Sequence, residues 1–301
     1  MSGVRHFLEV DDLDSQELAA VLDLAEMVDP PAVLAGRGVA LLFEKPSLRT
    51  RNATEMAVVQ LGGHPLSLRA EEVGVDVREP APDVARTLSR YHAAIGARVF
   101  EHAKLERMAA ASSVPVVNLL SDDAHPCEAL ADLLTLRRQF GRLEGLELAY
   151  VGDFNNVARS LGLAAALSNV SVRYACPDGY GPGDAEVARV GDLGGTMTAT
   201  TDPVGAVSGA HAVYTDVWAS MGAEDQAEHR RHAFNGFTVD QALMDRARPE
   251  AVFLHCLPAH RGEEVTAEVV DGPRSRVWEQ AENRMHTARG LLLFLLGREP
   301  A

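Results

Sequence analysis

The amino-acid sequence predicts an α/β protein of two domains, each a mostly parallel sheet with helices on both faces. Short apolar runs alternate with longer segments of helical periodicity along almost the whole chain. Such alternation is typical of parallel sheets covered by helices. The alternation forms two series, separated near Gly141 and Gly145, and the 301 residues are enough for two domains of ordinary size.

The first series lies before the glycine break. Its short apolar runs predict strands at Val39–Phe43, Pro65–Leu68, Ala94–Phe100 and Val114–Leu120. Apolar residues at helical spacing predict helices at Asp83–His92, His102–Ala111 and Cys127–Phe140.

The second series has the same character. We predict strands at Leu146–Val151, Val172–Ala175, Thr196–Thr200, Ala212–Thr215 and Val252–His255, and a helix at Val157–Ser168. A last helix covers Gln280–Leu296, and we expect it to cross back to the first domain. The first domain is therefore assigned residues 1–141 with 280–301, and the second domain residues 142–279.

Charge and cysteine content exclude several classes of protein. Lys plus Arg is 28 and Asp plus Glu is 43, so the net charge of −15 argues against nucleic acid or an anionic membrane as a partner. Cys127, Cys176 and Cys256 lie far apart, which favours a reducing compartment over a disulfide framework or structural zinc. The N-terminus has no signal-peptide pattern and Leu291–Leu296 is too short to span a bilayer, so we expect a soluble cytoplasmic protein.

An anion-binding segment follows the first strand. Ser47, Arg49, Thr50 and Arg51 stand at the start of a helical pattern, where backbone N–H groups, hydroxyls and guanidiniums suit a phosphate. Arginines early in a helix are often only solvated surface residues. The position just past the carboxyl end of a strand favours ligand binding.

Two further segments of the first series end or follow strands. Arg98 ends one strand, although a single arginine is often only a surface charge. His125 and Pro126 open a helix with Glu128 on the same face. The helix dipole favours a neutral imidazole, which can donate one hydrogen bond to a carbonyl oxygen. Helix capping is the alternative role for His125 and Glu128.

The second series carries polar residues at matching places. The segment Gly152–Asn156 lacks the later glycines of a dinucleotide fingerprint, so its two asparagines suit an amino-acid head group or a helix cap. Asp216 can pair with an ammonium group. Cys256 can be a nucleophile, a metal ligand with His255 and His260, or a packed core residue.

Taken together, these motifs resemble those of the ornithine carbamoyltransferases, in order and in spacing, over nearly the whole chain. The residues that carry the resemblance are Phe43–Arg51, Arg98, His125–Pro126, Asp153–Asn156, Asp216–Gly222, His255–Pro258 and Glu282–Arg284. The resemblance implies two α/β domains around an active-site cleft, usually assembled as a homotrimer with sites at subunit contacts.

The resemblance also implies a role for each motif residue. Ser47, the Leu48 backbone, Arg49 and Thr50 would bind the phosphate of carbamoyl phosphate. Its carbamoyl end would meet Arg98, His125, Glu128, Leu257 and Arg284, and ornithine would meet Asn156, Asp216, Ser220, Met221 and Cys256. Arg49, Arg98, His125 and Cys256 would be catalytic.

The implied reaction moves a carbamoyl group to the δ-amine of L-ornithine and releases L-citrulline and phosphate. Carbamoyl phosphate is already an activated anhydride, so no metal or organic cofactor is expected. One alternative is a related acceptor, although Asn156 disfavours putrescine and Asp216 disfavours acylated ornithine. Another alternative is a catalytically weak relative that acts as a binding or regulatory subunit.

The chain departs from the family pattern at four positions. Leu48 replaces the usual threonine, Glu128 the usual glutamine, and Gly74 a glutamine that reaches in from a neighbouring subunit. Phe154 replaces the usual small residue before the asparagine pair, which would narrow the ornithine pocket. Arg78 is a candidate substitute for that last glutamine. The charge of Glu128 is offset by nearby arginines, or removed by a raised pKa, or it weakens catalysis.

Overall fold

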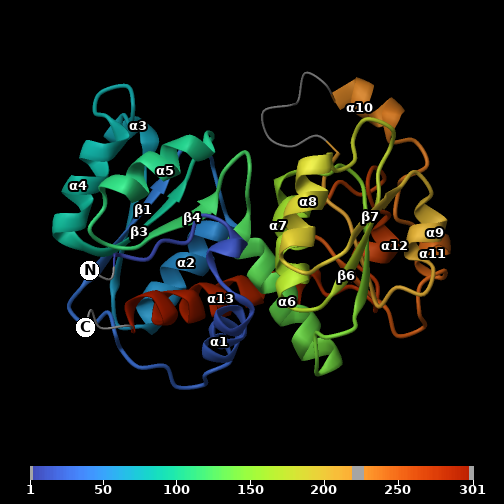
Figure 1. Cartoon of the computed structure of the whole chain (residues 1–301), viewed down its shortest axis with the longest axis horizontal. Helices are drawn as coiled ribbons and strands as arrows, with labels where there is room; N and C mark the ends of the chain where they lie inside the picture. The colour runs from blue at the N-terminus through green and yellow to red at the C-terminus, as the bar shows by residue number, and fades with distance from the viewer. Residues whose placement is uncertain (1–2, 219–226, 298–301) are drawn as a thin grey trace. The chain divides into compact units, whose positions relative to one another are not determined.

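The computed structural model describes residues 3–218 and 227–297, which form two compact α/β units (Figure 1). One unit comprises residues 1–131 and 282–301, and the other comprises residues 132–281. The division falls within two helices, α6 (Pro126–Phe140) and α13 (Val277–Leu296). Both units contain a parallel sheet with helices on its faces, which confirms the predicted fold class.

The first unit contains a four-stranded parallel sheet in the order β2-β1-β3-β4. The predicted strands of this series are all present, with ends shifted by one or two residues. They are β1 (Gly38–Phe43), β2 (His64–Arg69), β3 (His92–Arg98) and β4 (Val116–Leu120). The buried strand β1 lies between β2 and β3, and its last residue, Phe43, is in register with Arg98.

Strand alternation sends side chains to two helical layers in this unit. Ala40, Leu42 and Ile95 pack in one core with α4 (Ala81–Tyr91) and α5 (His102–Ala111). On the other face Val39 and Leu41 line a small apolar space with side chains of α2 (Arg49–Gln60), α6 and α13. Figure 1 shows α4 and α5 on one side of the strands and α2 and α13 on the other.

The second unit contains a five-stranded parallel sheet in the order β7-β6-β5-β8-β9. All five predicted strands are present: β5 (Glu147–Val151), β6 (Ser171–Ala175), β7 (Met197–Thr200), β8 (Ala212–Tyr214) and β9 (Val252–Leu254). The order reverses direction at β5, so the first strands of this unit wind outwards one way and the later strands the other. Ligands of open α/β sheets bind beside such a reversal, at the carboxyl ends of the strands.

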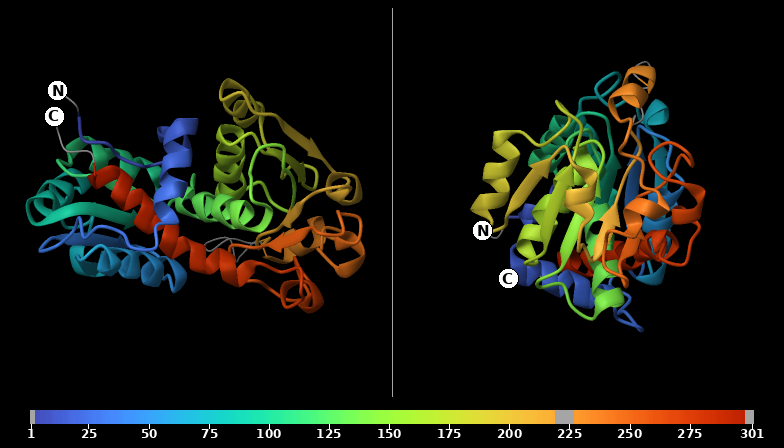
Figure 2. Two further views of the ribbon diagram at one scale, coloured as in Figure 1. Left: turned by 90° about the horizontal axis from the view of Figure 1, so that it is seen from below. Right: turned by 90° about the vertical axis from the view of Figure 1, so that its right-hand side faces the viewer.

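Helices cover both faces of the second sheet as well. The predicted helix α7 (Asn156–Leu167) lies with α8 (Asp184–Asp192) on one side in Figure 1, and the right-hand view of Figure 2 agrees. The opposite core joins Val151, Val213 and Phe253 to α9 (Pro203–Val207), α11 (Gln241–Met244) and α12 (Ala267–Val270). The sheet is thus buried on both faces, as its continuous apolar strands indicate.

Several short helices have no counterpart among the predicted elements. They are η1 (Val10–Asp12), α1 (Ser15–Ala25), α3 (Ala70–Val73), α8, α9, α10 (Ala227–Ala233), α11 and α12. Most span only one or two turns, for which apolar periodicity is a weak signal. Among the residues that the structure describes, no helix is both long enough and apolar enough to cross a membrane.

The contact between α1 and α13 in the first unit depends on a glycine. A Cβ atom on Gly290 of α13 would lie 2.5 Å from the carbonyl oxygen of Val21 and 2.7 Å from the nitrogen of Ala25. Both neighbours are backbone atoms of α1, which crosses α13 in Figures 1 and 2. Side-chain rotation cannot relieve such a contact, so the crossing requires glycine.

We therefore expect Gly290→Ala to lower stability, because overpacking of about 1–3 kcal/mol exceeds the gain of about 1 kcal/mol in helix propensity. The measurement is the midpoint of thermal unfolding by circular dichroism. Gly191→Ala on α8 is the matched control, since nothing lies within 4 Å of a Cβ atom there. An unchanged or raised midpoint for Gly290→Ala would contradict the close crossing.

Candidate functional site

The polar residues of the first unit gather where its strands end. Residues 47–50 follow β1 and open α2, and Arg98 is the last residue of β3. His125 follows β4 and precedes α6. The carboxyl ends of parallel strands share one edge of the sheet, so the topology itself brings these segments together.

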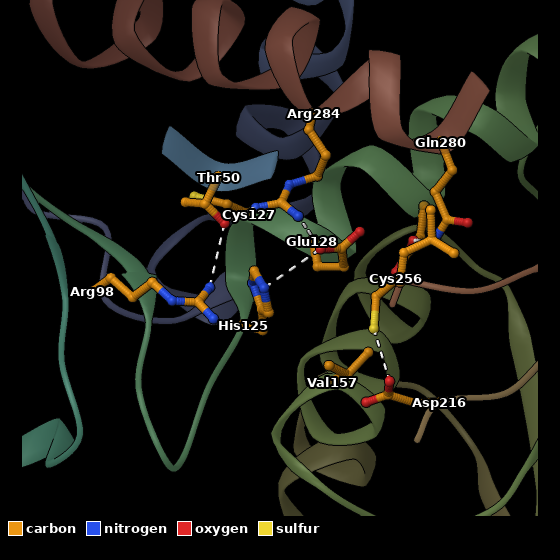
Figure 3. Close-up of polar contacts among 12 residues, drawn as sticks. Thr50, Arg98, His125, Cys127, Glu128, Val157, Asp216, Cys256, Gln280 and Arg284 are labelled. Atoms are coloured by element: carbon orange, nitrogen blue, oxygen red, sulfur yellow. Dashed lines mark hydrogen bonds and ion pairs between the residues drawn. The ribbon is translucent and has the colours of Figure 1, made fainter. Parts of the chain in front are cut away.

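Thr50 is the meeting point of two arginines from distant parts of the chain. Its hydroxyl oxygen accepts a hydrogen bond from Arg284 at 3.0 Å and one from Arg98 at 3.3 Å. All three side chains are buried. Figure 3 shows Arg98 and Arg284 converging on Thr50 from β3 and α13. Two guanidiniums and a hydroxyl held together in a buried position form a site for an anionic or strongly polarised ligand.

Glu128 supplies the negative charge inside this cluster. Its Oε2 atom forms a short ion pair with Nη1 of Arg284 and lies 3.4 Å from Nε2 of His125 (Figure 3). Glu128 is 2% exposed and Arg284 is 4% exposed, so neither charge is compensated by bulk water. Of the three readings of Glu128, the geometry supports the first, in which a nearby arginine offsets its charge.

His125 is a neutral imidazole in this setting. Its burial, followed by the positive charges of Arg284, Arg98 and Arg49, lowers the pKa of His125 well below the ordinary value of 6.5. The sequence led to the same neutral state from the helix dipole alone. Burial and the positive charges of the arginines are further causes that the structure adds.

The start of α2 presents the predicted anion-binding segment. No side chain caps this helix, whose N-cap residue is Leu48. Its first backbone N–H groups are therefore not taken up by a capping side chain. Leu48 points outwards with 73% of its surface exposed, so its contribution is confined to the backbone. The guanidinium of Arg51 lies 4.7 Å from the ring centre of Phe43, in a cation–π contact rather than at Thr50.

Lys45 also lies in this segment and was not among the residues predicted to bind the anion. Burial and the positive charge of Arg98 lower its pKa from the ordinary value. Its ammonium group lies 4.3 Å from the ring centre of Phe100. The feature of the sequence that pointed to Lys45 was its position between the strand and Ser47, at the edge of the sheet where the other cations gather.

The two adjacent asparagines of the second unit, Asn155 and Asn156, have different roles. The side chain of Asn155 caps α7 by accepting hydrogen bonds from the N–H groups of Val157 and Ala158 at 2.9 and 3.1 Å. Its amide also donates to Asp216 at 2.8 Å. Asn155 thus takes the capping role that one of the pair was expected to take, and Asn156 begins the helix itself.

Asp216 follows β8 and is held by donors on both oxygens. Oδ1 accepts from the backbone N–H of Val217 at 2.8 Å and from the Cys256 thiol at 3.0 Å, while Oδ2 accepts from Asn155. Figure 3 shows the Cys256 thiol directed at Asp216. The structure therefore joins two motifs that lie forty residues apart in sequence. Ser220 and Met221 lie outside the described residues.

The segment after β9 is fixed by a buried histidine. The backbone N–H of Leu257 donates to Nδ1 of His255 at 2.8 Å, and Nε2 of His255 donates to Glu264 at 3.2 Å. Leu257 has a left-handed backbone, with φ of 59°, and its peptide bond to Pro258 is cis. The His255 ring thus holds an unusual turn next to Cys256.

Two residues that support this turn were not identified from the sequence. Gln280 of α13 accepts from the backbone N–H of His255 at 3.0 Å and donates to Asp132 of α6 at 2.6 Å. All three residues are buried. The sequence did contain a sign of them in their spacing. Asp132 follows Glu128 by one helical turn, and Gln280 precedes Arg284 by one turn.

Asp153 has a role in pairing rather than in capping. Its carboxylate accepts a hydrogen bond from Arg230 of α10 at 2.6 Å. Burial raises the pKa of Asp153, and the bond to Arg230 opposes that rise. Arg230 also donates to the carbonyl of Trp218 at 2.7 Å, so it ties α10 to the segment after β8.

The sequence suggested Cys256 as a possible metal ligand with His255 and His260, and the structure groups Cys256 with His255 and Asp216 instead. Ligand atoms of Asp216, His255 and Cys256 lie within 4.8 Å of one another. Both ring nitrogens of His255 are nevertheless engaged, with Leu257 and with Glu264. The imidazole therefore serves the turn, and metal binding would require breaking one of these bonds.

Gly74 has a conformational reason to be glycine. It ends α3 in the left-handed region, with φ of 67°, and a Cβ atom there would lie 2.8 Å from that of Arg78. A glutamine at position 74 would be strained in this turn. Arg78, which the sequence suggested as a substitute, is exposed.

Comparison with known families gives two matches that together span most of the chain. Residues 5–138 match the carbamoyl-P binding domain of aspartate/ornithine carbamoyltransferase. Residues 144–295 match the Asp/Orn binding domain of the same family.

Individual relatives agree with these matches. The chain is 51% identical to the ornithine carbamoyltransferase of Acidothermus cellulolyticus over 302 residues, which cover 97% of each chain. The crystal structure of ornithine carbamoyltransferase from Thermus thermophilus is 50% identical, with a TM-score of 0.89 over 97% of this chain and 99% of that one. The structure of the Pyrococcus furiosus ornithine carbamoyltransferase is 43% identical, with a TM-score of 0.94 over 99% of each chain.

The three cysteines should differ in reactivity in the folded protein. Burial raises the pKa of Cys127 and of Cys176 to about 12, whereas Cys256 is partly exposed. The thiolate is the reactive form, so iodoacetamide at pH 8 should modify Cys256 first. Peptide mass spectrometry of timed samples measures the order. In denaturant all three should react alike, and equal rates in the native protein would contradict the burial of Cys127 and Cys176.

Proposed function

The chain belongs to the aspartate/ornithine carbamoyltransferase family, and we propose that it transfers the carbamoyl group of carbamoyl phosphate to the δ-amine of L-ornithine. The products are L-citrulline and phosphate. The observation that carries the proposal is the buried convergence of Arg98 and Arg284 on Thr50, next to the uncapped start of α2. Thr50 and Arg98 lie in the part of the chain that matches the carbamoyl-P binding domain, and Arg284 belongs to the same compact unit.

The phosphate of the substrate is assigned to the start of α2. Ser47, Arg49 and Thr50 offer two hydroxyls and a guanidinium there, and Leu48 offers its backbone N–H. A dianion is favoured at a helix N-terminus because the backbone N–H groups and the helix dipole both attract it. The same groups would stabilise phosphate as the leaving group.

The carbamoyl oxygen is assigned to Arg98 and His125, with Arg284, Glu128 and the Leu257 carbonyl completing that end of the substrate. Attack by the amine places negative charge on the carbamoyl oxygen. Arg98 and the neutral imidazole of His125 are donors that can stabilise this charge as it develops. Both are buried, so their orientation is set before the substrate binds.

Ornithine is assigned to the second unit. Asp216 is the anionic partner for its α-ammonium group, with Ser220 and Met221, and Asn156 is the partner for its α-carboxylate. Cys256 lies against Asp216 and is assigned to the δ-amine. A free alkyl amine has a pKa of about 10.4, so desolvation is needed to favour the neutral form that attacks.

The family match over residues 5–138 supports carbamoyl phosphate binding by residues 1–141, and the match over residues 144–295 supports ornithine binding by residues 142–279. The last helix, 280–301, is assigned to carbamoyl phosphate binding because residues 282–301 belong to the first compact unit, although the second match extends to residue 295. Holding both substrates in a reactive orientation supplies roughly 7–11 kcal/mol of barrier reduction in comparable reactions. The chemistry calls on no metal or organic cofactor, because carbamoyl phosphate is already activated.

We place the reaction in arginine biosynthesis and in the cytoplasm. A Pyrococcus furiosus relative named ornithine carbamoyltransferase, anabolic, is 43% identical over 304 residues, 97% of this chain and 96% of that protein. The free state of Cys127, Cys176 and Cys256 supports a reducing compartment.

A colorimetric assay for ureido products tests the proposed reaction. With carbamoyl phosphate, L-ornithine should give citrulline faster than lysine, putrescine or an acylated ornithine, because Asp216 and Asn156 suit a free α-amino acid. Asp216→Asn should raise the KM for ornithine, since the anionic partner of its ammonium group is lost.

Either of two results would overturn this reading. Absence of product with every amine would point to a binding or regulatory role instead. A preference for another amine would retain carbamoyl transfer and replace ornithine as the acceptor.

We also propose a homotrimer, on the resemblance to the family. The monomer has a mass of 32.3 kDa, so sedimentation equilibrium should give about three times that value. A single species at the monomer mass would exclude the trimer.

A further inference from the structure

We propose that Glu128 is a positioning residue that places the proton of His125 on Nε2 and holds Arg284 against Thr50. This role rests on the proposed function, because His125 and Arg284 are the groups assigned to the carbamoyl end of the substrate.

The first observation is the charge of the residue that faces the histidine. Glu128 is buried and forms an ion pair with Arg284, so its carboxylate is ionised and has only acceptor atoms. The same oxygen, Oε2, lies 3.4 Å from Nε2 of His125. An acceptor-only oxygen beside Nε2 favours the tautomer in which Nε2 carries hydrogen, because the other tautomer would place a lone pair against a negative oxygen.

The second observation is that His125 has a single ring proton to place. Its imidazole is neutral because burial and three arginines lower its pKa well below 6.5. A neutral imidazole ring donates from one nitrogen and accepts at the other. A preference for hydrogen on Nε2 therefore makes Nε2 the donor and Nδ1 the acceptor. Glu128 therefore determines which ring nitrogen of His125 is the donor.

The contact between Nε2 of His125 and Oε2 of Glu128 is long for a hydrogen bond. A separation of 3.4 Å between His125 and Glu128 is longer than the usual range of about 2.7–3.2 Å for N–H···O bonds. An acceptor closer to Nε2, which in the proposed reaction is the carbamoyl oxygen, would form a stronger hydrogen bond with it. Glu128 orients the proton without holding it firmly.

The third observation concerns Arg284. Nη1 pairs with Glu128 while Nη2 donates to Thr50 at 3.0 Å, so the guanidinium is held at two points (Figure 3). Thr50 also accepts from Arg98. Loss of the carboxylate would leave a buried cation without its anion, and would loosen the arrangement of both arginines around the hydroxyl.

Glutamine at this position has the same shape and a different effect. Its amide can present either an acceptor oxygen or a donor NH₂ group to Nε2, so it does not select one tautomer. It also carries no charge for Arg284. Glu128→Gln therefore separates the electrostatic role of the carboxylate from the space that it fills.

The test is ¹⁵N NMR of histidine-labelled protein, because the ring-nitrogen shifts distinguish the tautomers. Wild-type His125 should be the Nε2–H form at neutral pH, and Glu128→Gln should show a mixture with the Nδ1–H form. His125→Asn assigns the resonances. An Nδ1–H ring in the wild-type protein would overturn the proposal, even if the variant failed to fold.

Kinetics provide a second readout that loss of packing alone would not reproduce. Glu128→Gln should lower kcat about 10- to 100-fold, as the loss of a residue that fixes the tautomer of a metal-binding histidine does, with a much smaller change in the KM for carbamoyl phosphate. Glu128→Asp, which keeps the charge, should restore part of kcat. Glu72→Gln removes a carboxylate from an exposed pair with Arg69 and should leave kcat unchanged.

The outcomes separate this inference from the proposed function. If the wild-type protein forms citrulline and Glu128→Gln retains both its kcat and the Nε2–H tautomer, the positioning role is wrong and the function stands. If the wild-type protein forms no product, the function fails, and the wild-type tautomer still decides what Glu128 does to His125.

Discussion

The buried ion pair between Glu128 and Arg284 is the interaction on which the polar cluster around Thr50 depends. Both side chains are almost fully withdrawn from water, so each charge needs the other. The pair joins residues 156 positions apart and binds the last helix into the first unit. It also leaves Arg284 one N–H group for Thr50, through which Arg98 is connected. Removing either charge would therefore disturb both the packing of the last helix and the orientation of the groups assigned to the carbamoyl oxygen.

The second unit also contains a buried charged group that is held by partners from distant parts of the chain, and here the group is the carboxylate of Asp216. Asp216 is held by an asparagine, a backbone N–H and the Cys256 thiol, which together stabilise a buried carboxylate without any arginine. A carboxylate that is stabilised by neutral donors keeps its negative charge available for an ammonium group. The first unit places cations at its strand ends, and the second unit places an anion there. This difference accounts for the assignment of a dianionic substrate to one unit and an amino acid to the other.

The charge around His125 is opposite in sign to the net charge of the chain. The chain carries a net charge of −15, yet Arg49, Arg98 and Arg284 are close enough together to lower the pKa of His125. An acidic surface disfavours nonspecific binding of nucleic acid, and the buried basic cluster still offers an attractive potential to a small dianion. Glu128 is a buried negative charge inside this cluster, so it lowers the positive potential of the cluster. Its charge therefore acts on the site and not on the surface of the protein.

The sequence alone determined the fold class, the existence of every strand in the two described sheets, and the edge of each sheet at which polar residues would gather, because period and alternation are local properties. It also singled out Thr50, Arg98, His125 and Arg284. Only tertiary structure decided which of them touch, that Glu128 is paired, that Asn155 is the cap, and that Gln280 and Asp132 support His255. Those contacts join residues far apart in the chain. No local pattern records such pairings, since each partner alone is compatible with an ordinary surface or capping role.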